Sequence, residues 1–227
     1  MIPRILEPES MDGPDEAAAY DAMDHRGVND RFVADFLAAH GPCRGGELLD
    51  VGTGTARIPI ALARADARAR IVGFDLAPAM LALGERNVAD AGLSDRIRFI
   101  LGDAKSPTAL GDARYEAVIS NTIIHHIPDP TPALAAMVER LAPGGTLFVR
   151  DLARPDDQET LAGLVQAYAG DEAPDARELF RASLHAALTV DEIARTAEAV
   201  GLPADCVAMT SDRHWTLAWR RPPSPAV

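Results

Sequence analysis

Residues 47–57 constrain the fold of this chain more than any other stretch. Residues 47–51 are predicted to form a buried strand, with Leu48, Leu49 and Val51 as its apolar run. Gly52 and Gly54 follow, and they allow a sharp turn and the close approach of a ligand because no Cβ stands in the way. From Ile58 onward the apolar spacing indicates a helix. A strand, a glycine turn and a helix in this order are typical of the ligand-binding edge of an open α/β sheet.

The same alternation of strand and helix continues along the chain. Further strands are predicted at 71–75, 97–101, 115–120 and 146–149, and helices at 55–68, 77–91 and from Asp129-Pro130 to Leu141. Alternation of this kind predicts a parallel sheet with helices on both faces. Right-handed crossovers then bring the carboxyl ends of the strands to one edge of the sheet.

Helical patterns flank this alternating core on both sides. They occupy 14–24 and 29–40 before it, and 157–169 and 175–187 after it. Thr189 to Glu192 forms a capping box, which starts a helix that ends near Val200. Two short strands at 206–209 and 215–219 then predict a hairpin around Ser211-Asp212. The fold class expected is therefore α/β, a doubly wound, mostly parallel seven-stranded sheet with a C-terminal antiparallel hairpin.

Composition limits the classes of function. A chain of 227 residues is enough for one sizeable α/β domain. The net charge of −12 and the lack of a visible Lys/Arg cluster in the sequence argue against nonspecific binding of nucleic acid; the basic residues are nearly all arginine, and Lys105 is the one lysine. Cys43 and Cys206 have neither metal nor redox spacing. Without a visible signal peptide or membrane-spanning stretch, the sequence predicts a cytoplasmic protein that does not contact a membrane.

The glycine turn departs from two common nucleotide motifs. A dinucleotide fingerprint needs a third glycine, but Arg57 stands at that position and the nearest small residue is Ala56. A phosphate-binding P-loop is absent, since no Gly-Lys-Ser/Thr follows the turn. A dehydrogenase is therefore disfavoured.

The pattern Asp50-x-Gly52-x-Gly54-x-Ala56 resembles that of class I methyltransferases, which use S-adenosylmethionine. The resemblance covers about residues 47–151 and includes the turn Leu141-Ala142-Pro143-Gly144-Gly145 before the fifth strand. The family usually has glycine where Ala56 stands. The resemblance implies that the loop lies against the methionine and ribose parts of the cofactor.

The resemblance also implies a set of cofactor-binding residues at successive strand ends. Asp75 would bind the ribose diol, and Leu76 would lie against the adenine. Asp103 would accept a hydrogen bond from the exocyclic amine of the adenine. The full set is Asp50, Gly52, Thr53, Gly54, Asp75, Leu76, Asp103, Ala104, Asn121 and Tyr20. An alternative remains for both acids, since either can cap the segment that follows its strand.

Methyl transfer from a sulfonium needs an acceptor held in line, and a base only where the acceptor keeps its proton. His125 and His126, just after the fourth strand, are the candidates for that base. Adjacent residues point in different directions, so at most one is expected to face the substrate. Asp151 and Arg154 are the candidates for binding the acceptor, although a solvated arginine is the commoner case. No metal is expected, because no third ligand is positioned by sequence.

The family resemblance suggests a division of one domain, 1–227, into four parts. These are an N-terminal helical lid (1–41), a cofactor-binding core (42–151), inserted helices that shape the acceptor pocket (152–188), and a C-terminal helix and strand pair (189–221). The expected function is methyl transfer from S-adenosylmethionine to a small molecule, yielding S-adenosylhomocysteine, by a monomer or homodimer. An RNA or protein methyltransferase, or a protein that binds the cofactor without classical transfer, are the alternatives.

Overall fold

The computed structural model describes residues 2–7, 13–22 and 26–224. Contacts divide the chain into two compact units. The larger unit is made of Ser10–Asn121, Pro132–Val149 and Ala218–Val227, and the smaller of Met1–Glu9, Thr122–Thr131 and Arg150–Leu217. Each unit is built from several stretches of chain, so both depend on contacts between residues far apart in sequence.

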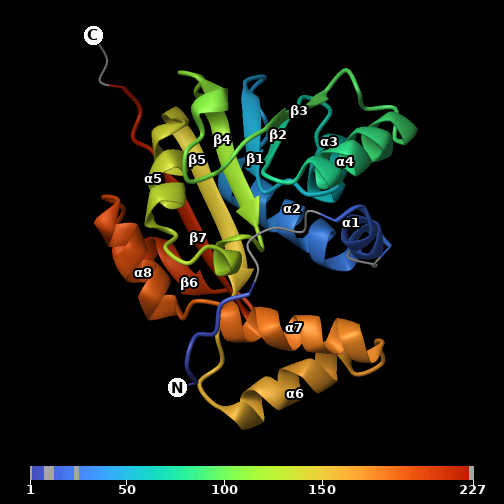
Figure 1. The fold of residues 1–227 in the computed structure, drawn as a ribbon. Helices are drawn as coiled ribbons and strands as arrows, with labels where there is room; N and C mark the ends of the chain where they lie inside the picture. The colour runs from blue at the N-terminus through green and yellow to red at the C-terminus, as the bar shows by residue number, and fades with distance from the viewer. Residues whose placement is uncertain (1, 8–12, 23–25, 225–227) are drawn as a thin grey trace. The chain divides into compact units, whose positions relative to one another are not determined.

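Seven strands form one sheet in the order β3-β2-β1-β4-β5-β7-β6 (Figure 1). The strands are β1 (Glu47–Val51), β2 (Arg70–Asp75), β3 (Ile97–Leu101), β4 (Tyr115–Asn121), β5 (Leu141–Leu152), β6 (Val207–Met209) and β7 (His214–Arg220). β1 pairs in parallel with β2 and β4, and β2 in parallel with β3. β6 and β7 are antiparallel. The predicted seven-stranded, mostly parallel sheet with a C-terminal hairpin is confirmed.

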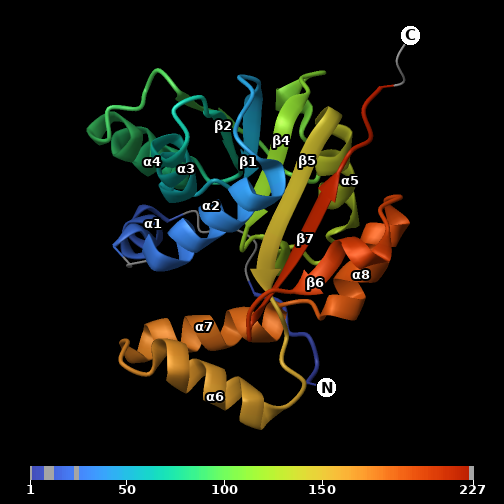
Figure 2. The ribbon, with the colours of Figure 1, turned by 180° about the vertical axis from the view of Figure 1, so that it is seen from behind.

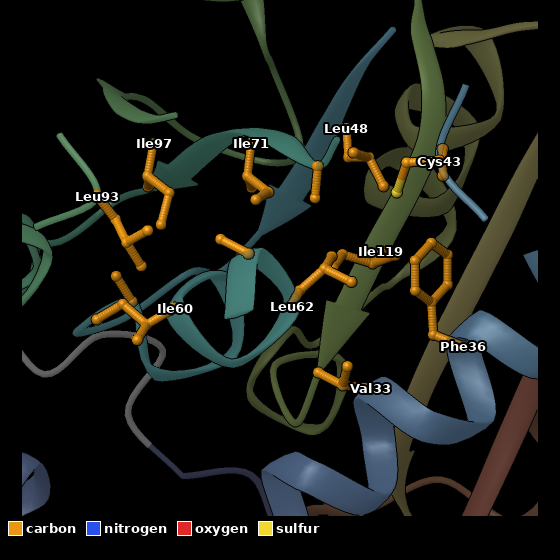
Figure 3. Packing of buried hydrophobic residues seen from close by; sticks show 14 of the residues in the cluster. Val33, Phe36, Cys43, Leu48, Ile60, Leu62, Ile71, Leu93, Ile97 and Ile119 are labelled. Atoms are coloured by element: carbon orange, nitrogen blue, oxygen red, sulfur yellow. The ribbon is translucent and has the colours of Figure 1, made fainter. Parts of the chain in front are cut away.

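Helices cover both faces of the sheet in the larger unit. They are α1 (Pro14–Asp21), α2 (Arg26–His40), α3 (Arg57–Ala65), α4 (Pro78–Asp90) and most of α5 (Thr131–Glu139). Figure 3 shows the first face, where Phe36 of α2 and Leu62 of α3 lie near Leu48 of β1. On the opposite face, Leu49 of β1 and Met137 of α5 line the same small apolar pocket. Consecutive strand residues point to opposite faces, so Leu48 and Leu49 each anchor one helical layer.

The smaller unit has its own hydrophobic core. It contains the 3₁₀ turns Ile124–His126 and Ala204–Cys206 and the helices α6 (Gln158–Ala169), α7 (Pro174–Ala186) and α8 (Val190–Ala199). α6 and α7 run side by side (Figure 1, Figure 2) and bury Leu161 and Leu184 completely. Ile2 of the N-terminal segment joins this cluster. The predicted capping box at Thr189 and Glu192 is confirmed, with both reciprocal hydrogen bonds present.

Some element boundaries differ from those predicted. β5 begins at Leu141 rather than at Thr146, so Pro143-Gly144-Gly145 lies inside the strand. The cause is the chain beyond β7, because Arg221 N–H donates to the carbonyl of Gly145 at 2.8 Å. α1 ends at Asp21, and the rest of the helix predicted to Asp24 reaches residues outside those described. The four-part division of the chain stays a prediction.

Candidate functional site

The loop after β1 adopts left-handed backbone conformations at three positions. Gly52 has φ +73°, Gly54 +53° and Ala56 +65°. The N–H groups of Gly52 and Thr53 both donate to the carbonyl of Phe74 in β2. A Cβ built on Gly54 would meet nothing within 4 Å, so the loop has open space on that side. Both glycines therefore serve a turn that leaves room for a ligand.

Asp75 holds this loop to the end of β2. Its Oδ2 accepts the Gly54 N–H at 2.8 Å, and its Oδ1 accepts the Ala77 N–H at 2.9 Å. The bond to Ala77 is a turn just before α4, whose N-cap is Ala77 itself, so the predicted alternative of a helix cap is not formed. A carboxylate oxygen can accept more than one hydrogen bond, so these bonds do not exclude a second role for Asp75.

Asp50 lies under the loop and is 2% exposed. Its Oδ2 accepts the Thr53 hydroxyl at 2.7 Å. Burial raises the pKa of Asp50 to about 7, and the nearby Asp75 carboxylate acts in the same direction, against the Thr53 hydrogen bond. Ionised Asp50 is thus unfavourable in this site, and a cation next to it would favour the ionised form.

α1 lies against the start of α4. Ala17, Tyr20, Ala77 and Met80 form one apolar cluster. Burial raises the pKa of Tyr20, and the carboxylates of Asp75, Asp21 and Asp50 raise it further. Tyr20 is therefore close enough to the acids of the glycine loop for their charges to affect its pKa. Its contact with a cofactor stays a prediction.

A polar clamp fixes α1 to the loop and to α4. Asp21 accepts two hydrogen bonds from Arg57, at 2.9 and 2.7 Å, and one from Asn87 at 3.0 Å. Asn87 also donates to the carbonyl of Thr55 in the loop at 3.0 Å. Arg57 is the residue at the third glycine position of the dinucleotide motif. It connects the glycine loop to α1, a role that sequence reasoning missed because Asp21 is 36 residues away.

The other predicted cofactor residues lie at the ends of β2, β3 and β4. Leu76, directly after β2, is 41% exposed. Asp103 accepts the backbone N–H of Lys105 at 2.8 Å and pairs with its ammonium group at 3.3 Å, so it does cap its own turn. Ala104 follows in that turn, and Asn121 is the last residue of β4. Their contacts with a cofactor stay predictions.

His125 and Asp151 form a buried pair in the smaller unit. Nδ1 of His125 lies 2.6 Å from Oδ1 of Asp151, whose side chain is fully buried. The N–H groups of His125 and Leu152 also donate to this carboxylate. Burial opposes both charges, but Asp151 outweighs it and, with Glu7, raises the pKa of His125 to about 9. Asp151 is thus fully engaged by protein groups, and His125 must release a proton before it can act as a base.

Glu7 joins both histidines from the N-terminal segment. Its Oε1 lies 3.3 Å from Nε2 of His125 and 3.2 Å from Nδ1 of His126. Ser183 of α7 donates to the same oxygen at 3.0 Å. Sequence reasoning missed Glu7, because it lies 118 residues before His125 and no motif surrounds it. The base roles of His125 and His126 stay predictions.

Arg154 is engaged within the smaller unit. Arg154 donates hydrogen bonds to Glu192 at 2.6 Å and to the carbonyl of Ala187 at 3.0 Å. Arg154 is 6% exposed. The alternative of a solvated loop arginine is therefore wrong. A role in binding an acceptor stays a prediction, and in this arrangement it would need Arg154 to leave Glu192.

Thr122, directly after β4, is a non-glycine residue with φ +55°. This left-handed conformation strains a β-branched residue, whereas asparagine tolerates it. We expect Thr122→Asn to increase the free energy of unfolding by about 1 kcal/mol. Urea denaturation measures this, and an unchanged or lower stability would show that the threonine side chain compensates for the strain.

The sequence of this chain resembles those of known proteins. Residues 48–145 match the methyltransferase domain family. The ubiquinone biosynthesis O-methyltransferase of Methylococcus capsulatus is 33% identical over 119 residues, which are 52% of this chain and 48% of that protein. The demethylmenaquinone methyltransferase of Bacteroides fragilis is 28% identical over 143 residues, 62% of this chain and 58% of that one. The chain thus spans about half the length of these curated relatives.

The fold is shared more widely than the sequence. A solved S-adenosylmethionine-dependent methyltransferase of Methanococcus maripaludis aligns with 98% of this chain and 99% of its own, with a TM-score of 0.70 at 18% identity. Within the part of the chain that the structure describes, no helix is long and apolar enough to cross a membrane. Residues 48–145 therefore belong to the methyltransferase domain family, and the chain has the fold of the class I S-adenosylmethionine-dependent methyltransferases.

Proposed function

We propose that this chain binds S-adenosylmethionine on the glycine loop of the larger unit and transfers its methyl group to a small-molecule acceptor. The observation that carries the proposal is the pair of carboxylates at the loop, Asp50 beneath it and Asp75 at its side. The cofactor carries a sulfonium and an ammonium group. A cationic ligand would relieve the unfavourable proximity of these two acids.

The residues around the loop fit the cofactor part by part. The open side of Gly54 leaves room for the ligand to reach the backbone. Asp75 lies beside the loop, and a carboxylate can bind both hydroxyls of a ribose. The exposed Leu76 offers an apolar surface to the adenine ring. We propose that Tyr20 of α1, which packs against the start of α4, contacts the methionine part of the cofactor.

The bound cofactor supplies an electrophilic methyl group with its own leaving group. The chain's residues therefore have to bind and orient the two reactants and to exclude water. A proton acceptor is needed only where the acceptor is a protonated hydroxyl or amine. We propose His125 or His126 for that proton, and Asp151 and Arg154 as residues that shape the acceptor site.

The acceptor class proposed is a small molecule. The relatives named above act, by their names, in ubiquinone biosynthesis and on demethylmenaquinone. The net charge of −12 disfavours nucleic acid. Phenols and quinols are therefore the acceptors with which a search should begin. We propose a monomer or homodimer in the cytoplasm.

Two glycine variants test the cofactor site. Gly54 and Gly111 both have φ +53°, and a Cβ at either meets nothing within 4 Å. Both Gly54→Ala and Gly111→Ala should destabilise the fold, by about 1 kcal/mol or more, and Gly111→Ala controls for this loss because its ψ of −135° also disfavours alanine. Only Gly54→Ala should weaken binding of S-adenosylhomocysteine, by at least about tenfold, because its methyl group takes up space proposed for the ligand. Equal affinities of the two variants in calorimetry would contradict the proposed site.

Transfer itself is tested with S-adenosylmethionine that carries a labelled methyl group. The proposal expects label in a phenol or quinol, together with S-adenosylhomocysteine. Binding without release of S-adenosylhomocysteine across a broad acceptor panel would favour a cofactor-binding protein that lacks classical transfer. Label in RNA or protein instead would favour the macromolecular alternative.

A further inference from the structure

We propose that Glu7, His125 and His126 form a binding site for a divalent first-row transition metal in the smaller unit. One ligand atom from each residue lies within 4.8 Å of the other two. Two imidazoles and a carboxylate form a ligand set that suits zinc, iron, cobalt and nickel. The inference does not depend on the proposed cofactor site, whose residues all lie in the larger unit. A bound metal would replace the base role proposed for the two histidines, because a ring nitrogen that ligates a metal cannot accept a proton.

The two distances from Glu7 are those expected between neighbouring ligands of one metal ion. Glu7 Oε1 is 3.3 Å from His125 Nε2 and 3.2 Å from His126 Nδ1. Charge-assisted hydrogen bonds between such groups are shorter, about 2.7–2.9 Å. Donor atoms around a metal with bonds of about 2.0–2.2 Å lie about 3.0–3.5 Å apart at neighbouring positions. The short contact in the cluster, 2.6 Å, is instead the one between His125 Nδ1 and Asp151.

Asp151 is hydrogen-bonded to the second ring nitrogen of His125, as carboxylates often are to histidines that bind a metal. A carboxylate on one ring nitrogen fixes the tautomer and turns the other nitrogen toward the metal. Asp151 is bonded to His125 Nδ1, and it is itself held by the N–H groups of His125 and Leu152. His125 Nε2 consequently faces Glu7. Sequence reasoning expected no metal for want of a third ligand, and Glu7 provides one.

The third ligand is fixed in place by the N-terminal segment. Arg4 donates to the carbonyls of Ile127 and Ala186 at 2.9 and 2.7 Å, and the Ile5 N–H donates to the carbonyl of His185 at 3.1 Å. Glu7 also accepts the Ser183 hydroxyl. These bonds connect the segment both to the turn that carries the histidines and to α7. Hydrogen bonds that hold a ligand residue in place before the metal arrives strengthen a metal site.

The two carboxylates near the histidines need positive charge to balance them. The side chains of Glu7 and Asp151 are 10% and 0% exposed, and two buried carboxylates need positive charge nearby. Either protons on the two imidazoles or one divalent ion can balance them. A metal with three protein ligands would keep at least one position open for water or an oxygen donor. The choice between protons and metal is what the experiment decides.

The test is a Co²⁺ titration of the full, untagged and chelator-treated protein, followed by visible absorption and calorimetry. We expect about one Co²⁺ per chain with an absorption spectrum distinct from the hydrated ion, displaced by Zn²⁺. Glu7→Gln and His126→Gln should weaken binding at least about tenfold, and Asp151→Asn about 10- to 100-fold. Glu178→Gln is the matched control, because that side chain on α7 is 75% exposed.

Two results would overturn the proposal. One is a spectrum that stays that of hydrated Co²⁺ with the unmodified protein, which would leave protons as the balancing charge. The other is equal Co²⁺ affinity of Glu7→Gln, Glu178→Gln and the unmodified chain. Circular dichroism verifies the fold of each variant, and Glu7→Gln keeps the size of the side chain. S-adenosylhomocysteine affinity is measured in parallel, so a failed cofactor site and a failed metal site give separate outcomes.

Discussion

Asp75→Ala is expected to weaken binding of S-adenosylhomocysteine by about 10- to 150-fold, which corresponds to about 1.5–3 kcal/mol. The range is that of hydrogen bonds to a charged group. Two losses contribute to it. The proposed bonds to the ribose hydroxyls disappear, and the Gly54 N–H loses its acceptor, so the loop is less firmly fixed. Isothermal calorimetry measures the change directly.

Asp75→Asn separates these two contributions. Asparagine keeps one acceptor oxygen in place of two and carries no charge, so it can replace only part of the bonds to Gly54, Ala77 and the ribose hydroxyls. We therefore expect an intermediate loss of affinity for Asp75→Asn. The exposed Asp95, in the same unit, provides the control Asp95→Ala with unchanged affinity. A folded Asp75→Ala protein that binds S-adenosylhomocysteine as tightly as the unmodified chain would exclude Asp75 from the site.

The local parts of the fold and site were predictable from sequence. β1 and β3 have the predicted bounds, because each is a short apolar run that ends at a glycine or an acid. The glycine loop needs no distant residue to be recognised, since its spacing alone carries the pattern. Asp75 lies 21 residues beyond Gly54, within the same strand–helix–strand unit, and the family order made it a candidate.

The parts that sequence missed depend on contacts over long separations. In the sequence, Arg57 is only a departure from the third glycine of the dinucleotide motif. Its partner Asp21 lies in a separate helix. Glu7 stands in a short proline-punctuated segment with no helical or strand period. Such a residue becomes a candidate only when folding brings it to the histidines. Charge and side-chain type indicate what these residues can do, but not which partner they meet.

Asp50→Asn is expected to change how stability depends on pH. Asp50 has a pKa of about 7 in the folded protein, against an ordinary value of 3.8. A carboxyl group with a raised pKa stabilises the fold below its unfolded pKa and loses that contribution as the pH rises through the folded value. From pH 5 to pH 8 this group alone should therefore remove about 2–3 kcal/mol from the free energy of unfolding.

Urea denaturation at both pH values measures the effect as a difference between proteins. Other groups titrate equally in the unmodified chain and in the variant, so they cancel. The advantage of Asp50→Asn over the unmodified protein should grow by about 2–3 kcal/mol from pH 5 to pH 8. Asp95→Asn, at an exposed site in the same unit, is measured alongside as the control substitution. Parallel stability curves for Asp50→Asn and the unmodified protein would show that Asp50 is ionised in the folded state at pH 5 as well.

The same variant connects stability to the proposed ligand. A buried acid next to a second carboxylate destabilises the empty site, and a cationic ligand would convert that cost into affinity. Saturating S-adenosylmethionine should therefore lower the pKa of Asp50 and flatten the stability curve of the unmodified protein between pH 5 and pH 8. Asp50→Asn should bind the cofactor more weakly at pH 8 than the unmodified chain does, and the difference should shrink at pH 5. A gain in both stability and affinity at pH 8 would mean that Asp50 does not face the cationic part of the ligand.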